Sequence, residues 1–75
     1  MKVQTVNVIE VIDMSVAQVF SFYDHTKGNK EAEAAFVKLA EKNGMSEDET
    51  EEALESRYWN DGGESRVSIF LTHSS

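Results

Sequence analysis

The chain contains no cysteine and no proline among its 75 residues. Without cysteine, neither a disulfide nor a thiolate metal site can stabilise the fold, which must rest on one compact hydrophobic core. The sequence also lacks an apolar run of the roughly 18–20 residues that a membrane span needs. Residues 1–7 lack the apolar centre of a signal peptide. We therefore expect a single domain over residues 1–75, located in the cytoplasm.

Basic residues are scarce as well. Seven Lys and Arg stand against fourteen Asp and Glu, which gives a formal net charge of -7. Because phosphate backbones and anionic membranes attract clustered cations, this balance argues against direct binding to nucleic acid or to a membrane. It favours a protein partner with a basic surface. The alternative is that the charge serves only solubility, since a net charge of this size is ordinary for a small domain.

Much of the negative charge lies in residues 46–55, where six of ten residues are acidic and none is basic. The spacing Ser46-x-x-Glu49 predicts a capping box, and acidic residues in a first helical turn interact favourably with the helix dipole. We therefore predict a short acidic helix from Glu47 to about Leu54. The later acids have no such local reason to be there: Glu51, Glu52 and Glu55.

Two segments rich in β-branched residues open the chain and predict an antiparallel hairpin. The first expected strand is Val3–Ile12, and the polar residues 13–15 form the turn. In this strand Val6, Val8 and Ile12 share one face, while Val3, Ile9 and Val11 share the other. The imperfect alternation indicates either two partly covered faces or a bulge near residues 8–9. Asn7 and Glu10 are expected where solvent reaches the strand.

The second expected strand is Val16–His25. Strict alternation places Val16, Phe20 and Phe22 on one side of it, and Ala17, Val19 and Tyr23 on the other. The two phenylalanines are the expected core residues of this half.

A helix from Lys30 to Asn43 follows a break at residues 26–29, where Thr26 or Asn29 is the expected N-cap. Its apolar residues recur at helical spacing and form one stripe for burial: Ala32, Ala35, Phe36, Leu39 and Ala40. Gly44 is expected to end the helix in a left-handed conformation.

The C-terminal part reads as a short strand at residues 57–59, a turn at 60–63, and a strand Glu64–His73. In the last strand Val67, Ile69 and Leu71 face the core. Together these elements predict an α+β fold in the order ββααββ. We expect an antiparallel sheet of three or four strands, with the main helix packed on one face and the acidic helix beside it.

Catalytic and metal-binding patterns are weak throughout. His25, His73 and Asp24 lie near strand ends and could meet as metal ligands, but their spacing matches no metal motif, and two exposed histidines are the simpler reading. Residues 26–30 open a helix with two lysines yet lack the phosphate-binding loop pattern. No serine has the setting of a nucleophile. We therefore expect no catalytic residue, no metal, no cofactor and no enzymatic activity.

Three aromatic residues near the acidic run leave two interpretations open. If Tyr58, Trp59 and Phe70 are exposed together, they form an aromatic patch with a carboxylate rim, which is typical of a protein interface. Alternatively, Trp59 closes the end of a small core that needs every large side chain.

The chain resembles small acidic accessory proteins of bacteriophages. The resemblance rests on the helix–Gly–Met–Ser-x-x-Glu joint at residues 40–49, the Tyr-Trp-Asn-Asp-Gly-Gly turn at 58–63, and the strand at 67–73. It implies a stoichiometric inhibitor or modulator of a host enzyme, acting in the host cytoplasm.

The sequence thus leads to the hypothesis that the chain is a non-enzymatic protein that binds a basic surface of another protein. A more specific version is that its carboxylates mimic the phosphates of nucleic acid. The candidate partner-binding residues are Glu47, Asp48, Glu51, Glu52, Glu55, Tyr58 and Trp59. The alternative is a structural or assembly subunit. It would homo-oligomerise through a sheet edge, or through Phe70 and the exposed face of Val3, Ile9 and Val11, and a homodimer is one such form.

Overall fold

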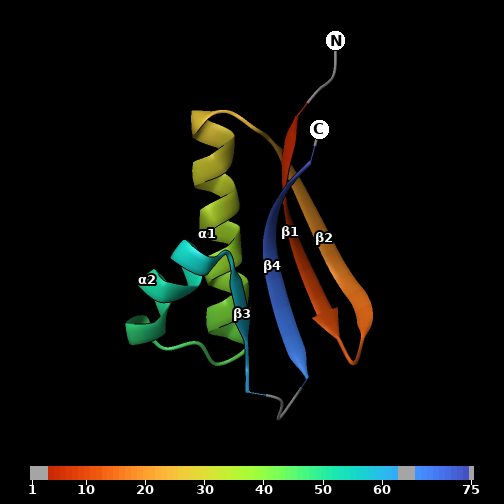
Figure 1. Cartoon of the computed structure of the whole chain (residues 1–75), viewed down its shortest axis with the longest axis vertical. Coiled ribbons are helices and arrows are strands. Elements are labelled where there is room, and N and C mark those ends of the chain that lie inside the picture. Colours follow the sequence, from red (N-terminus) through yellow and green to blue (C-terminus); the bar gives the residue numbers. More distant parts are fainter. Residues whose placement is uncertain (1–3, 63–65, 75) are drawn as a thin grey trace.

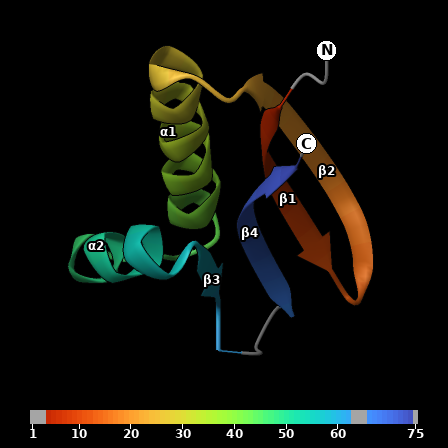
Figure 2. The ribbon, with the colours of Figure 1, turned by 45° about the horizontal axis from the view of Figure 1, so that its top comes forward.

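The computed structural model describes residues 4–62 and 66–74 and has the α+β architecture predicted from the sequence. Its elements are β1 (Thr5–Ile12), β2 (Ser15–Tyr23), α1 (Thr26–Lys42), α2 (Glu47–Ser56), β3 (Tyr58–Asn60) and β4 (Val67–Ser74). The strands form one antiparallel sheet in the order β2-β1-β4-β3. Both helices lie on the same side of this sheet, and α2 projects away from α1 (Figures 1 and 2). The expected position Val3 lies outside the described residues.

The core lies between α1 and the central strands. Val6 and Val8 of β1 and Ile69 of β4 point toward α1 and are almost fully buried. The predicted stripe of α1 is confirmed, because Phe36 is fully buried at its centre and the neighbouring positions Ala32, Leu39 and Ala40 are buried too. Burial of a large apolar side chain contributes about 1.5–3 kcal/mol, so these contacts dominate the stability of the domain.

Helix α1 begins four residues earlier than predicted. His25 is the N-cap, and its Nδ1 accepts a hydrogen bond of 3.0 Å from the Gly28 backbone N–H. The predicted start at Lys30, with Thr26 or Asn29 as the cap, is therefore wrong. Gly28 does not break the helix. It is buried, and a Cβ at this position would lie 1.8 Å from the carbonyl oxygen of Tyr23. The glycine permits a close approach of α1 to the end of β2.

The end of α1 follows the prediction. Gly44 has a φ of +111°, and Met45 folds back so that its backbone N–H donates to the carbonyl of Ala40 over 2.9 Å. The Met45 side chain is buried. This cap turns the chain sharply, so that α2 starts at once and leaves the sheet.

The β1–β2 hairpin closes through a two-residue turn at Asp13 and Met14. Both have positive φ values, 52° and 67°, although neither is a glycine. A two-residue hairpin turn of this handedness matches the twist of the strands, and it usually contains Asn or Gly because left-handed backbone is unfavourable for other residues.

A bulge at Ala17 changes the phase of β2. Glu10 pairs with Gln18 and Val11 pairs with Val16, so that Ala17 is the extra residue. Val16 therefore lies on the same face as Val19. The sequence prediction, which placed Val16 with Phe20, is wrong. β1 keeps its alternation, so the irregularity lies in β2 and not near residues 8–9.

The two phenylalanines of β2 are not the main core residues. Phe20 is 39% exposed and Phe22 is half-buried. Both point toward the helical side, but β2 is an edge strand, while α1 also lies over β1 and β4. The edge position leaves Phe20 half-covered, which the periodicity of the segment could not indicate.

Glu10 is buried, with 5% of its surface exposed, although the sequence indicated solvent access at this position. It lies on the helix-facing side of β1 with Val6 and Val8. One carboxylate oxygen accepts a 3.1 Å hydrogen bond from the side-chain amide of Asn43, the C-cap of α1. A buried carboxylate is stable only with such a partner, and the pair ties the end of α1 to the sheet.

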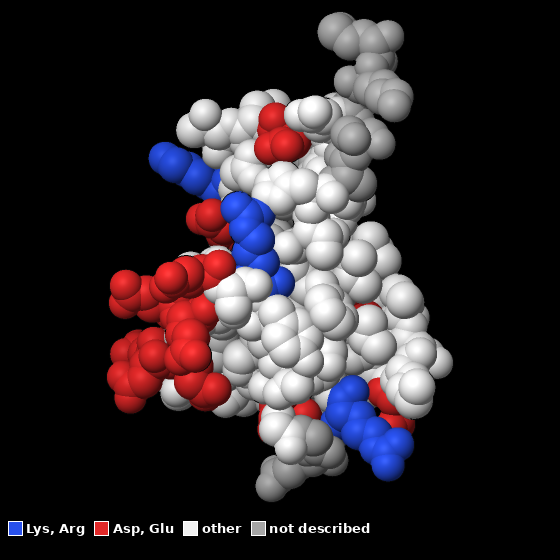
Figure 3. Space-filling view, in the orientation of Figure 1, with Lys and Arg blue, Asp and Glu red and all other residues white. Residues whose placement is uncertain are grey.

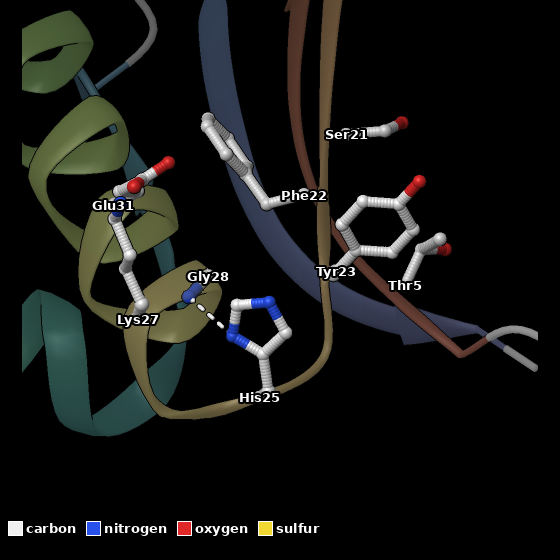
Figure 4. Close-up of a pocket in the computed structure, with 8 residues that line it drawn as sticks. All are labelled: Thr5, Ser21, Phe22, Tyr23, His25, Lys27, Gly28 and Glu31. Atoms are coloured by element: carbon white, nitrogen blue, oxygen red, sulfur yellow. Dashed lines mark hydrogen bonds between the residues drawn. The ribbon is translucent and has the colours of Figure 1, made fainter.

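Within the described residues no helix covers the other side of the sheet, and we refer to this side as the open sheet face. Alternation along the paired strands assigns to it Thr5, Asn7, Ile9, Val11, Val16, Val19, Ser21, Tyr23, Tyr58, Asn60, Ser68, Phe70 and Thr72. Figure 4 shows the division at the end of β2, where Phe22 points toward α1 and Ser21 points away from it.

Candidate functional site

Helix α2 carries a continuous acidic surface. A single residue of the helix, Ala53, is buried, and Leu54 is half-buried against the core. The carboxylates on the remaining sides point into solvent and form what we call the acidic helix surface: Glu47, Asp48, Glu51, Glu52 and Glu55. Figure 3 shows these acidic side chains gathered over α2 at the left edge of the molecule. The structure thus brings together all five acidic residues that the sequence predicted as partner-binding.

No cation neutralises this surface within the described part of the chain, where none of its five carboxylates forms an ion pair. Arg57 stands at the end of α2, yet its guanidinium lies 2.8 Å from Nδ1 of His73 on β4. Along the helix the acids repeat at four-residue spacing, as in Glu47–Glu51 and Glu51–Glu55. Each such like-charge pair destabilises a helix by about 0.2–0.5 kcal/mol. The surface therefore opposes the stability of the helix that carries it.

Glu49 belongs to the same run but has a different role. Its carboxylate accepts hydrogen bonds from the backbone N–H of Ser46 at 3.2 Å and from the Ser46 hydroxyl at 3.1 Å. The predicted capping box is therefore confirmed. The backbone hydrogen bond, followed by that of the hydroxyl, holds the pKa of Glu49 below its usual value of 4.5. Because this carboxylate is engaged at the start of α2, we do not include it in the acidic helix surface.

Trp59 is a core residue, which decides between the two interpretations left open by the sequence. Its side chain is 6% exposed, whereas Tyr58, the preceding residue of β3, is 37% exposed on the open sheet face. Tyr58 packs against Phe70, with 5.0 Å between ring centroids. The three aromatic residues therefore do not form one patch beside the acids, because neighbouring residues of a strand point to opposite faces.

The Trp59 indole N–H has no hydrogen-bond partner among the described residues. It lies close enough to the Glu49 carboxylate to lower the pKa of that group slightly further, without reaching hydrogen-bond geometry. Asn43, Gly44 and Asn60 line the same hollow. Trp59 thus packs the junction between α2, β3 and the end of α1.

His73 and Asp24 approach each other, as the sequence allowed. Nε2 of His73 lies 3.9 Å from a carboxylate oxygen of Asp24 and 3.2 Å from the side-chain oxygen of Asn29. With Arg57 on its other nitrogen, His73 links β4 to the start of α1 and the end of α2. His25 is engaged as the N-cap of α1. Within residues 4–62 and 66–74, no three His, Asp or Glu side chains are grouped so that they could hold a metal ion.

A hollow of about 550 Å³ lies between the end of β2 and the first turn of α1 (Figure 4). Tyr23, His25, Lys27 and Glu31 are among its lining residues. Residues 26–30 were a candidate phosphate site in the sequence. In the structure the backbone N–H of Gly28 already donates a hydrogen bond to the side chain of His25. With Glu31 beside Lys27, the hollow also contains a carboxylate that disfavours an anion. The hydrogen bond to His25 and the carboxylate of Glu31 therefore both weigh against a phosphate in this hollow.

The sequence did not indicate the structural roles of two residues that position the ends of α1. Glu10 and Gly28 fix the two ends of α1, one through the Asn43 amide and the other through contact with Tyr23. The burial of Glu10 could have been predicted from the alternation of β1, because Glu10 lies on the same face of the strand as Val6 and Val8.

In the described part of the chain, neither helix has the length and apolar character required to cross a membrane. The chain matches no protein-family model, no curated protein and no solved structure.

Proposed function

We propose that this chain is a non-enzymatic binding module whose acidic helix surface engages a basic surface of a partner protein and inhibits or modulates that partner. One observation supports this most strongly. Five carboxylates stand on one short helix without a neutralising cation in the described residues, although their repulsion opposes helix formation. A basic partner surface would relieve that repulsion and would be attracted over a long range.

The acidic residues of α2 fall into two groups, those that the helix dipole explains and those that it does not. Glu47 and Asp48 interact favourably with the helix dipole, so their presence has a structural reason. Glu51 and Glu52 lie beyond the first turn and lack this reason, and Glu55 lies in the last turn, where the dipole disfavours negative charge. These three residues are the most informative targets.

The test compares two variants with the same change of net charge. The triple substitution Glu51→Lys/Glu52→Lys/Glu55→Lys reverses the acidic helix surface. The control Glu31→Lys/Glu33→Lys/Glu41→Lys reverses three exposed glutamates of α1. Each purified protein serves as bait in a lysate of the native host, with mass spectrometry of the retained proteins. Circular dichroism establishes that each variant is folded.

We expect the α1 variant to retain the partner captured by the wild-type chain, and the α2 variant to lose it. Capture by the folded α2 variant at the wild-type level would refute the proposal. Competition by duplex DNA for the captured partner would identify the acidic surface as a mimic of nucleic acid, and lack of competition would leave a protein-specific basic site.

A further inference from the structure

The open sheet face is apolar at its centre, and none of its described residues is charged. Of its thirteen described residues, those that are apolar or aromatic are Ile9, Val11, Val16, Val19, Tyr23, Tyr58 and Phe70. Several are well exposed, with 63% of Val16, 53% of Val19 and 65% of Tyr23 accessible to solvent. A contiguous apolar surface of this kind on a small soluble domain marks an interaction site.

Two pairs of polar side chains on this face are hydrogen-bonded within it. The Ser21 hydroxyl donates to the side-chain oxygen of Asn7 over 2.7 Å, and the Asn60 amide donates to the Tyr58 hydroxyl over 2.8 Å. Burial of a polar group is costly chiefly when the group loses its hydrogen-bond partner. Because these partners lie within the face, a second surface could cover the two pairs without breaking their hydrogen bonds.

The distribution of charge indicates what covers the face. The chain has a formal net charge of -7, and the acidic helix surface lies on the helical side of the sheet, away from this face (Figures 1 and 3). A partner with a charged surface would lose hydration here and would find no opposite charge. A second copy of the chain brings an equally uncharged face and keeps the acidic helices on the outer sides of the pair.

The area of the face is close to what a specific dimer needs. Strands about 4.8 Å apart, rising about 3.3 Å per residue, give the four-stranded face a flat area of roughly 450 Å². Side-chain relief increases the accessible area, so two copies together bury on the order of 1,000 Å², near the lower limit for a specific interface. The expected dimer is therefore of moderate affinity.

We propose that two copies of the chain associate through their open sheet faces to form a symmetric β-sandwich. Sheets that pack in this way lie about 10 Å apart with their strands rotated by about 30°. The proposal is independent of the function proposed for the acidic helix surface. The competing geometry is edge-to-edge pairing of β2, whose nine residues include no charge. The face is favoured because it carries four of the seven large hydrophobic residues that are exposed in the described part of the chain: Val16, Val19, Tyr23 and Tyr58.

Two neighbouring residues of β2 allow the geometries to be distinguished. Val19 lies on the open sheet face, and Gln18 is an exposed residue on the opposite face of the same strand. The substitution Val19→Lys places a charge inside the proposed interface, and Gln18→Lys places the same charge outside it. Sedimentation equilibrium of the full chain over a range of concentrations measures the association of each variant, and circular dichroism measures its fold.

We expect the wild-type chain to dimerise, Gln18→Lys to leave association unchanged, and Val19→Lys to weaken it by about 30-fold or more, as burial of an unpaired charge requires. If Val19→Lys does not fold, Thr72→Lys on β4 tests the same face from an exposed polar position. A wild-type monomer at every concentration overturns the proposal. Equal weakening by both β2 variants, or weakening by neither, overturns it as well.

Discussion

Helices α1 and α2 follow each other directly in the chain but are stabilised in different ways. α1 has 17 residues and buries five of them against the sheet, whereas α2 has 10 residues and buries one. The charged residues of α1 include lysines and glutamates, while α2 contains acids alone. Tertiary packing therefore holds α1. A capping box, the helix dipole and one buried alanine hold α2.

Under the function proposed above, this difference separates the residues that stabilise the fold from those that bind a partner. Substitutions in the apolar stripe of α1 should change the free energy of unfolding, because this stripe forms the core with β1 and β4. Substitutions on the outer sides of α2 should change what the molecule binds and leave the core intact. If the separation holds, loss of a core side chain of α1 has the largest effect on unfolding, and titration of a carboxylate on α2 has the smallest.

Replacement of Phe36 by Ala should destabilise the domain by about 3–5 kcal/mol, because it leaves a cavity at the centre of the core. Phe36 is fully buried in the structure. For a domain of this size such a loss is a large part of the total stability, so the variant should be partly unfolded at room temperature. Urea titration followed by circular dichroism measures the effect. A midpoint near that of the wild-type chain would show that α1 is not the main source of stability.

Replacement of Gly28 by Ala should destabilise the domain by about 2–3 kcal/mol, because the added methyl group overpacks a closed contact. Its Cβ would meet the carbonyl of Tyr23, so α1 would have to move away from β2. At an exposed helical position the same substitution stabilises by about 1 kcal/mol, since Ala is the better helix former. A lowered melting temperature would show that the close contact with Tyr23 outweighs the higher helix propensity of Ala. A raised melting temperature would contradict the close contact.

Replacement of Ser46 by Ala should cost about 1 kcal/mol, the usual effect of losing an N-cap side chain. The Ser46 hydroxyl donates to Glu49 at the start of α2. The matched control is Ser56→Ala, which removes a hydroxyl at the other end of the helix, where it donates to the carbonyl of Glu52. Chemical denaturation of both variants should show the larger loss for Ser46. Equal losses would mean that the cap does not determine where α2 begins.

The smallest expected effect is a pH dependence from Glu49. Its pKa in the folded chain lies below the usual value of 4.5, so the stabilisation from its ionised form is complete above that value. As the pH falls from 4.5 through the folded pKa, the carboxylate is protonated and the stabilisation is lost. The wild-type chain should therefore lose more stability than Glu49→Gln between neutral and acidic pH. Parallel denaturation curves at two pH values measure the difference, and an identical loss in both chains would contradict it.

The sequence predicted the elements whose pattern is local and repeated. The stripe of α1 and the alternation of Val67, Ile69 and Leu71 could be recognised because burial on one side imposes a fixed period. The acidic helix surface could also be predicted, since Ser46 and Glu49 determine where α2 begins.

What could not be predicted depends on contacts between distant segments. The start of α1 depends on the fit of Gly28 against Tyr23, and a glycine ordinarily indicates a break. The burial of Glu10 depends on an amide 33 residues away in the chain. Which of Tyr58 and Trp59 is buried depends on which side of the sheet α1 covers. The alternation within β3 alone does not indicate that side.

Trp59 gives the molecule a built-in optical probe. It is the sole tryptophan of the chain, and it packs where α2, β3 and the end of α1 meet. Its fluorescence therefore reports on the α2 end of the domain, whereas far-ultraviolet circular dichroism is dominated by the longer helix α1. Coincident transitions by the two signals would mean that the domain unfolds cooperatively as a single unit. An earlier fluorescence transition would mean that the acidic helix can detach while the sheet and α1 remain folded.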